Sequence, residues 1–237
     1  KKMIKHCMTA LLAVCICGAS LAADVPKAEY SKDAHTLFLC HFNSADEVKA
    51  LGGIISDGVK FVTGKFGNGA LFEVKGDKIT FPAKGAFNMK QGTVEMFIKP
   101  TINYNELKFP DDPPPYFFHV FNGDGNYAAL QYNVDNKTIV APIFSTEDGT
   151  KRSYTQSRIS WKAGEWHHVA FTWGNGAVTI YIDGKLAVTS KYDGGMCKLP
   201  EKFLVGSVSW NIGSAHAVID EMRIYDTPLD FNKAEDW

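Results

Sequence analysis

Residues 164–188, GEWHHVAFTWGNGAVTIYIDGKLAV, restrict the fold more than any other stretch of this sequence. Successive side chains of a β-strand point to opposite faces, and large apolar residues here alternate with small or polar ones on both sides of two turn-like pairs. These pairs are Asn175-Gly176 and Asp183-Gly184, and such residues accept the positive φ angles of two-residue hairpin turns. The stretch therefore predicts three consecutive antiparallel strands.

The same alternation limits what His167 and His168 can do. Neighbouring residues of a strand point to opposite faces, so these two side chains cannot both ligate one metal ion. This weakens an interpretation of the stretch as a zinc site and favours a structural role for the hairpins.

Short strand-like runs, rich in β-branched and aromatic residues, recur between residues 36 and 226 with turn residues between them. Long helical periodicity is missing, and only residues 44–51 and 228–237 look helical. Residues 101–116 are rich in Pro and polar side chains, which predicts a long surface loop. The pattern as a whole predicts an all-β sandwich or barrel.

The first 23 residues have the layout of a secretory signal peptide: a basic start, an apolar run over residues 8–21, and small residues at Ala22 and Ala23 where cleavage is expected. The apolar run is short for a membrane span, which needs roughly 20 residues. The sequence therefore predicts a secreted, periplasmic or cell-surface protein without a membrane span.

A lipid anchor at Cys15 or Cys17 is disfavoured, because the bulky residues Val14 and Ile16 precede them. We expect a signal peptide over residues 1–23, a polar N-terminal segment over residues 24–35 and one β-domain over residues 36–237.

Two cysteines, Cys40 and Cys197, lie beyond the predicted signal peptide. Cys40 alternates with Phe38 and Phe42, which predicts a buried, inert thiol. An exported protein can form a disulfide between these two cysteines, but nothing in the sequence brings Cys40 and Cys197 together.

The near-neutral net charge of the chain gives little information about its binding partners. The 25 Lys and Arg residues nearly match the 26 Asp and Glu residues, so we predict no binding to nucleic acid or to an anionic membrane surface.

Three further segments combine with residues 164–188 into a family pattern. GKFGNGALFEV (64–74) resembles a glycine-rich entry into an early strand, GTVEMFIKP (92–100) resembles the next core strand, and IDEMRIYDTPLD (219–230) resembles a closing strand. Together, and in this order, they resemble the LamG-like, concanavalin A-like lectin/glucanase superfamily. The resemblance implies a jelly roll of two antiparallel sheets. It leaves function open, because the family includes sugar-binding modules, adhesion domains and parts of polysaccharide-degrading enzymes.

The resemblance also gives a test for catalysis. Glycosidases of the superfamily carry a Glu-x-Asp-x-x-Glu strand motif, whose carboxylates share one face, and no glutamate of this chain has that spacing. Glu95 has Phe97 at the position of the motif's aspartate. Glu95 and Glu221 could face each other from neighbouring strands, but Arg223 offers either of them an ion pair. We predict no catalytic residue.

Asp220 is the most informative polar residue. Strict alternation places it on one face with Val218, Met222 and Ile224, where a carboxylate needs a hydrogen bond or a metal. The family resemblance implies a structural calcium ion, held by Asp220 together with Asn43, although calcium prefers more carboxylate ligands than this pair supplies. The alternative is that Asp220 accepts hydrogen bonds from turn amides or from Asn43. No other cofactor is expected.

Carbohydrate is recognised by aromatic rings that stack on sugars and by amides and carboxylates that bind hydroxyls. Trp161, Trp166 and Trp173 are expected to pack in the fold. The candidate ligand residues lie outside the expected core, and those without rings are expected to line one sheet beside Tyr181 and Arg223. They are Tyr104, Trp210, Gln131, Asn133 and Glu95.

These observations favour a secreted, non-catalytic binding module for carbohydrate or a glycosylated protein. The alternatives are a glycoside hydrolase or its accessory subunit, and a structural or adhesion domain that binds protein.

Overall fold

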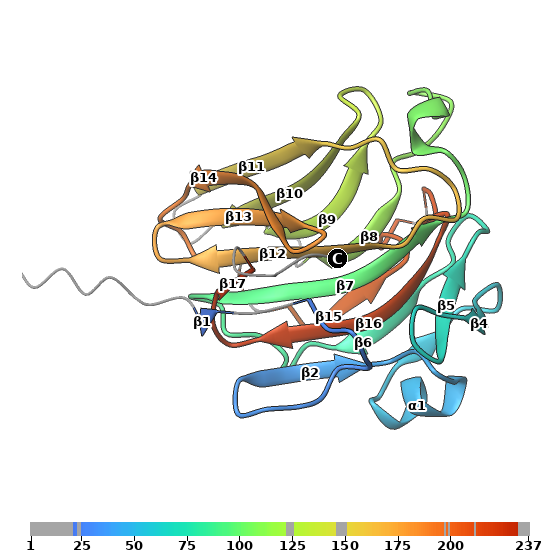
Figure 1. The fold of residues 1–237 in the computed structure, drawn as a ribbon, viewed down its shortest axis with the longest axis horizontal. Helices are drawn as coiled ribbons and strands as arrows, with labels where there is room; N and C mark the ends of the chain where they lie inside the picture. The colour runs from blue at the N-terminus through green and yellow to red at the C-terminus, as the bar shows by residue number, and fades with distance from the viewer. Residues whose placement is uncertain are drawn as a thin grey trace, which may run out of the picture.

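The computed structural model describes residues 21–22, 25–121, 126–145, 151–196, 198, 200–210 and 212–231. They form two antiparallel sheets that lie against each other as layers (Figure 1). The predicted all-β, two-sheet sandwich is confirmed.

One layer has eight strands. In spatial order they are β14 (Lys185–Lys191), β13 (Ala177–Ile182), β12 (His167–Gly174), β7 (Gly92–Pro100), β16 (Ala217–Tyr225), β5 (Asn68–Phe72) and β4 (Lys60–Thr63), with β2 (Thr36–Cys40) also paired to β16.

The other layer has seven strands. In spatial order they are β11 (Lys151–Arg158), β10 (Thr138–Ser145), β9 (Tyr127–Asn133), β8 (Tyr116–Phe121), β15 (Lys202–Val205), β6 (Ile79–Pro82) and β3 (Ile54–Ile55).

Few elements of regular secondary structure lie outside the two sheets in the described part of the chain. Helix α1 (Ala45–Ala50) confirms the helix expected near residues 44–51, and the Ser44 side chain caps it by accepting the Glu47 N–H. A single 3-10 turn, η1 (Tyr104–Glu106), lies in the loop between β7 and β8. The expectation of helix near the C-terminus is wrong at β17 (Leu229–Asp230), which pairs in parallel with β1 (Leu21–Ala22). Residues 232–237 lie outside the described part of the chain.

The predicted hairpins are confirmed. Asn175 and Asp183 adopt positive φ angles of 53° and 50°, and the three strands that these turns join, β12, β13 and β14, pair in antiparallel register. Val169, Phe171 and Trp173 are buried in the main core with residues of both sheets. Alternation along the hairpin therefore sorts its side chains between the core and the outer face of the eight-stranded sheet.

A β-bulge in β16 makes one prediction from alternation wrong. The register shifts between Asp220 and Arg223, and Glu221 adopts a φ of 54°. Ile219 and Met222 consequently both face the core between the sheets, whereas Asp220 is turned towards the loop that precedes β5. An extra residue in one strand shifts the alternation of every residue beyond it.

Cys40 is fully buried in the main core, as predicted, and burial raises the pKa of its thiol well above its ordinary value. Cys197 lies outside the described residues, so a disulfide between the two stays a prediction. The signal peptide also stays a prediction, because most of residues 1–24 lie outside the described part. Within that part, no helix has the length and apolar character needed to cross a bilayer.

Candidate functional site

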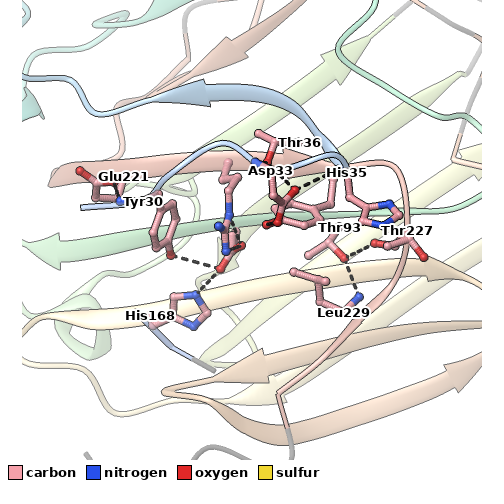
Figure 2. Close-up of polar contacts among 12 residues, drawn as sticks. Tyr30, Asp33, His35, Thr36, Thr93, His168, Glu221, Thr227 and Leu229 are labelled. Carbon is pink, nitrogen blue, oxygen red and sulfur yellow. Dashed lines mark hydrogen bonds and ion pairs between the residues drawn. The ribbon is translucent and has the colours of Figure 1, made fainter. Parts of the chain in front are cut away.

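Glu95 lies in the middle of a buried polar cluster on the outer face of the eight-stranded sheet. Its Oε1 accepts hydrogen bonds from Arg223 Nε and Nη2 at 2.7 and 2.6 Å. Its Oε2 lies 2.9 Å from His168 Nε2 and accepts the Tyr30 hydroxyl at 3.1 Å. Figure 2 shows Tyr30 and His168 reaching this oxygen from different sides. Every oxygen of the Glu95 carboxylate therefore has a protein partner.

Within the polar cluster, the Glu95 carboxylate and the Arg223 guanidinium balance each other's charge. Burial works to raise the pKa of Glu95, but the His168 hydrogen bond and the Arg223 charge outweigh it and lower that pKa below its ordinary value. The Arg223 guanidinium also lies 4.2 Å from the ring centre of Tyr30 and 4.5 Å from that of Tyr225. Two rings and a carboxylate thus hold one cation.

The polar N-terminal segment covers this cluster, which makes the expectation that Glu95 contacts a ligand wrong. Tyr30 donates its backbone N–H to Glu221 Oε2 at 2.7 Å and its hydroxyl to Glu95, so it separates the two carboxylates that could have faced each other. Val25 and Tyr30 also pack in an apolar cluster with Phe97 of β7. Glu95 is fully buried and serves to attach the N-terminal segment to the sheet.

Tyr104 is likewise a core residue and not the surface aromatic that its loop predicted. Its ring is 1 % exposed, and it packs against Phe117 and Tyr132 with ring centres 6.0 and 5.2 Å away. Its hydroxyl donates to the Ala215 carbonyl at 2.7 Å. The Pro-rich loop folds back onto the sandwich, and its one buried aromatic ring fills space there.

Asp220 and Asn43 both bind the glycine-rich segment that leads into β5, Asp220 in the loop and Asn43 at the first residue of the strand. Asp220 Oδ2 accepts the backbone N–H groups of Lys65 and Phe66 at 2.7 and 3.0 Å, and Asn43 Oδ1 accepts the Asn68 N–H at 2.7 Å. Asp220 therefore accepts hydrogen bonds from turn amides, as the alternative to calcium binding predicted. The two predicted metal ligands are brought to the same short segment, residues 65–68.

The fit of these residues to calcium is partial. Burial raises the pKa of Asp220 to about 7, and its Oδ1 is buried without a hydrogen-bond partner among the described residues. The side-chain oxygens of Asp220 and Asn43 are of the kind that bind a hard cation such as calcium. However, no three His, Cys, Asp or Glu side chains gather into a metal site anywhere in the described ranges. Calcium held by Asp220 and Asn43 stays a prediction.

Aromatic side chains gather on the outer face of the seven-stranded sheet. We call this surface the aromatic face. Its members come from β8 to β11 and from the loop after β15, and they are Tyr116, His119, Phe121, Tyr127, Phe144, Tyr154 and Trp210.

Ring contacts connect the aromatic face from one end to the other. Trp210 meets the rings of His119 and Phe121 edge-on, with centres 5.1 and 5.6 Å apart. The His119 ring meets Tyr127 at 5.3 Å, Tyr127 stacks on Phe144 at 5.4 Å, and Phe144 meets Tyr154 at 4.9 Å. Four neighbouring strands, spaced by about 4.8 Å, give this row a length of about 14 Å.

The most exposed members of the aromatic face lie at its two ends. Trp210 is 44 % exposed, Phe121 41 % and Tyr154 61 %. An exposed, connected set of large apolar side chains marks a candidate binding surface, whereas scattered single ones do not.

Gln131 and Asn133 of β9 lie on this same outer face. Gln131 Oε1 accepts the Tyr127 hydroxyl at 2.7 Å, which leaves its amide N–H groups as donors for another partner. The expectation that Gln131 and Asn133 lie beside Glu95, Tyr181 and Arg223 is wrong, because those three belong to the outer face of the eight-stranded sheet. The two sheets and the core between them separate the two groups.

His119 is the unusual member of the aromatic face. It is fully buried beneath its ring neighbours, and neither ring nitrogen has a hydrogen-bond partner among the described residues. Burial lowers the pKa of His119 to about 4, so the ring is neutral at neutral pH. A neutral imidazole offers one donor and one acceptor.

We expect this burial to make the fold sensitive to acid. The unfolded chain takes up a proton at His119 near pH 6.5 and the folded chain only near pH 4, so stability falls as the pH falls through that window. The full shift corresponds to about 3 kcal/mol. Urea unfolding of the wild type and of His119→Phe at pH 7, 6, 5 and 4.5 measures it, and the variant should lose less stability. Parallel pH profiles of the two proteins would contradict this account.

Sequence reasoning named Trp210, Gln131 and Asn133 but missed His119, Phe121, Phe144 and Tyr154. A signal was present in KRSYTQSR (151–158), where an aromatic residue and long polar residues alternate with Ser and Thr. That alternation places the large side chains of an edge strand on the solvent side.

The comparisons with known proteins agree with this architecture. The family model described as the concanavalin A-like lectin/glucanases superfamily matches residues 73–232, well over half of the chain. The chain belongs to this superfamily. No curated protein sequence matches it.

Solved structures of the concanavalin A-like fold extend the likeness. One is domain 4 of AbnA, a GH43 extracellular arabinanase of Geobacillus stearothermophilus in complex with arabinotriose; it is 21 % identical, with a TM-score of 0.57 over 74 % of this chain and 82 % of that one. Another is the binding domain of Paraclostridial Mosquitocidal Protein 1, 16 % identical, with a TM-score of 0.64 over 83 % of this chain and 50 % of that one.

A third is the binding domain of botulinum neurotoxin serotype D, 15 % identical, with a TM-score of 0.58 over 76 % of this chain and 43 % of that one. This chain therefore spans half or less of the two toxin domains. At such identities the likeness shows the fold alone.

Proposed function

We propose that this protein is a secreted, non-catalytic binding module that holds carbohydrate, free or on a glycosylated protein, on its aromatic face. The observation that carries the proposal is the continuous row of rings from Trp210 to Tyr154, with amides beside it. Rings stack on the apolar faces of sugars, and amides bind their hydroxyls. The arabinotriose complex of the AbnA domain supports a sugar-binding role for a domain of this fold.

His119 adds a specific contact to this proposal. Buried polar groups without partners are rare in folded proteins and call for an explanation. A sugar hydroxyl both donates and accepts, so it would bond either nitrogen of the His119 ring, the donor or the acceptor, if Trp210 swung aside. The exposed position of Trp210, on the loop after β15 and not on a strand, suits such a movement.

A glycan array with broad polysaccharide coverage, followed by titration of the hits, tests the proposed function. Trp210→Ala and Tyr154→Ala each remove an exposed ring from one end of the face, and each should weaken binding about tenfold or more, as at other ring-dominated interfaces. Because both side chains are substantially exposed, the melting temperature should change little.

Phe109→Ala is the matched control. Phe109 is 58 % exposed, but it lies in the loop between β7 and β8 and not on the aromatic face. Its variant should bind as the wild type does. A blank array together with a protein partner captured equally well by Trp210→Ala would reject the proposed function in favour of an adhesion role. Turnover of any labelled polysaccharide by the wild type would instead indicate an enzyme.

A further inference from the structure

The edge strand β11 carries two arginines on the same outer face as the row of rings. Its exposed side chains alternate along the strand, and they are Arg152, Tyr154, Gln156 and Arg158. Backbone pairing places Arg152 opposite Phe144 and Arg158 opposite Thr138 of β10. The Arg152 guanidinium lies 5.4 Å from the ring centre of Phe144, so the row of rings ends on a cation.

Neither arginine forms an ion pair within the described residues. Lys151, the neighbour of Arg152, differs because its Nζ lies 3.7 Å from Asp193 Oδ1. The outward positions of the described strands β8, β9 and β10 carry aromatic, amide, hydroxyl and small apolar side chains and no Asp or Glu. On the described strands β8 to β11, the charged side chains of this face are therefore Arg152 and Arg158, although the whole chain carries a net charge of −1.

We propose that the ligand of the aromatic face is an acidic polysaccharide, whose sugar rings stack on the aromatic row and whose carboxylate or sulfate groups bind Arg152 and Arg158. This inference rests on the proposed function and adds the chemical class of the sugar. A guanidinium suits an acidic polysaccharide, because its planar fork of N–H donors binds carboxylate and sulfate-like groups through two parallel hydrogen bonds.

The spacing of the two arginines favours a polymer over a small anion. They are six residues apart along one strand, which corresponds to about 20 Å. One small anion cannot reach both side chains at once, whereas a chain with an anionic group on repeated sugars can. Gln156 lies between them, and its Oε1 accepts the Thr138 hydroxyl at 3.0 Å, so its amide N–H groups remain as donors to sugar hydroxyls.

Single-stranded nucleic acid also combines ring stacking with phosphate contacts, but it carries a charge on every nucleotide and is bound by proteins with a strongly basic surface. Two arginines on a chain of near-neutral charge fit a polymer of sparser charge better. Nucleic acid is therefore an outcome of the test and not the proposal.

Two matched pairs of polymers test the inference: polygalacturonate against its fully methyl-esterified form, and dextran sulfate against dextran. Within each pair the backbone is the same and the charge differs. Titration calorimetry at 50 and 300 mM NaCl should show at least tenfold tighter binding to the charged member of one pair, weakening with salt. The pair that responds identifies the anionic group as carboxylate or sulfate.

Arg152→Gln and Arg158→Gln should each weaken binding to the charged polymer about three- to tenfold and leave binding to the neutral one unchanged. Arg152→Lys keeps the charge but loses the fork, so it should retain part of the affinity. Lys151→Gln is the matched control, because its charge is already paired, and it should bind as the wild type does. All three positions lie on the surface, so melting temperatures should stay within a degree or two of the wild type.

The outcomes separate the two proposals. Equal affinity for charged and neutral polymers, unchanged in the arginine variants, would overturn the acidic ligand and leave the carbohydrate module standing. Tighter binding to poly(dT) than to either charged polysaccharide would also overturn it. Failure to bind any polysaccharide, on the array or in solution, would overturn both.

Discussion

Replacing Arg223 by methionine is expected to lower the free energy of unfolding by about 3–5 kcal/mol, because it leaves the buried Glu95 carboxylate without its cation. Arg223 supplies two of the hydrogen bonds to Glu95, and both side chains are nearly or fully buried. The loss also removes the guanidinium from between the rings of Tyr30 and Tyr225. Tyr30 should detach with it, and with Tyr30 the N-terminal segment.

Urea unfolding and hydrogen exchange at the Tyr30 amide measure the two effects of Arg223→Met. The double variant Glu95→Gln/Arg223→Met removes both charges and should recover part of the lost stability, which distinguishes an unpaired charge from lost packing. Lys49→Met is the control: its 4.0 Å ion pair with Asp46 is exposed and should contribute less than about 1 kcal/mol. A loss for Arg223→Met as small as that control would contradict the account of the polar cluster.

The polar cluster and the aromatic face lie on opposite outer surfaces of the sandwich. Arg223→Met should therefore leave ligand affinity unchanged at temperatures where the variant is folded. The same separation explains why Glu95, a residue that the family resemblance brought to attention, belongs to stability and not to the proposed binding surface.

Local alternation and turn chemistry predicted most of the fold. The Asn175-Gly176 and Asp183-Gly184 turns needed no long-range information, because residue type and spacing fix both the turn and the faces of the flanking strands. The bulge at Glu221 could not be predicted from the sequence. Its positive φ is adopted by a glutamate, a residue type that gives no local warning, and the register beyond it shifts by one residue.

The candidate site was less predictable because it depends on which surfaces become covered. Trp210 lies in a loop and was identified from its context, but Tyr104 looked equivalent and is buried against Tyr132. Glu95 was expected to be open because nothing in the sequence says that residues 25–30 fold over β7. Alternation assigns a side chain to a face of a sheet, but only tertiary packing decides whether that face meets solvent.

The position of Trp210 depends in turn on a glycine at the base of its loop. Gly206 follows β15 with a φ of 92°, accepts the Ala215 N–H at 2.7 Å and donates to the Phe117 carbonyl. A Cβ at this position would overlap the ring of Phe72 in the core. Gly206→Ala should therefore cost about 3 kcal/mol or more, from the strained φ together with overpacking.

Gly164→Ala separates the two contributions, because Gly164 also has a positive φ, 86°, but nothing lies within 4 Å of a Cβ built there. It should cost only about 1 kcal/mol. Since the overlap with Phe72 displaces the base of the loop, Gly206→Ala should also weaken carbohydrate binding as Trp210→Ala does, whereas Gly164→Ala should not. Equal stability losses in the two alanine variants, with binding intact in both, would mean that the core does not hold the Trp210 loop in place.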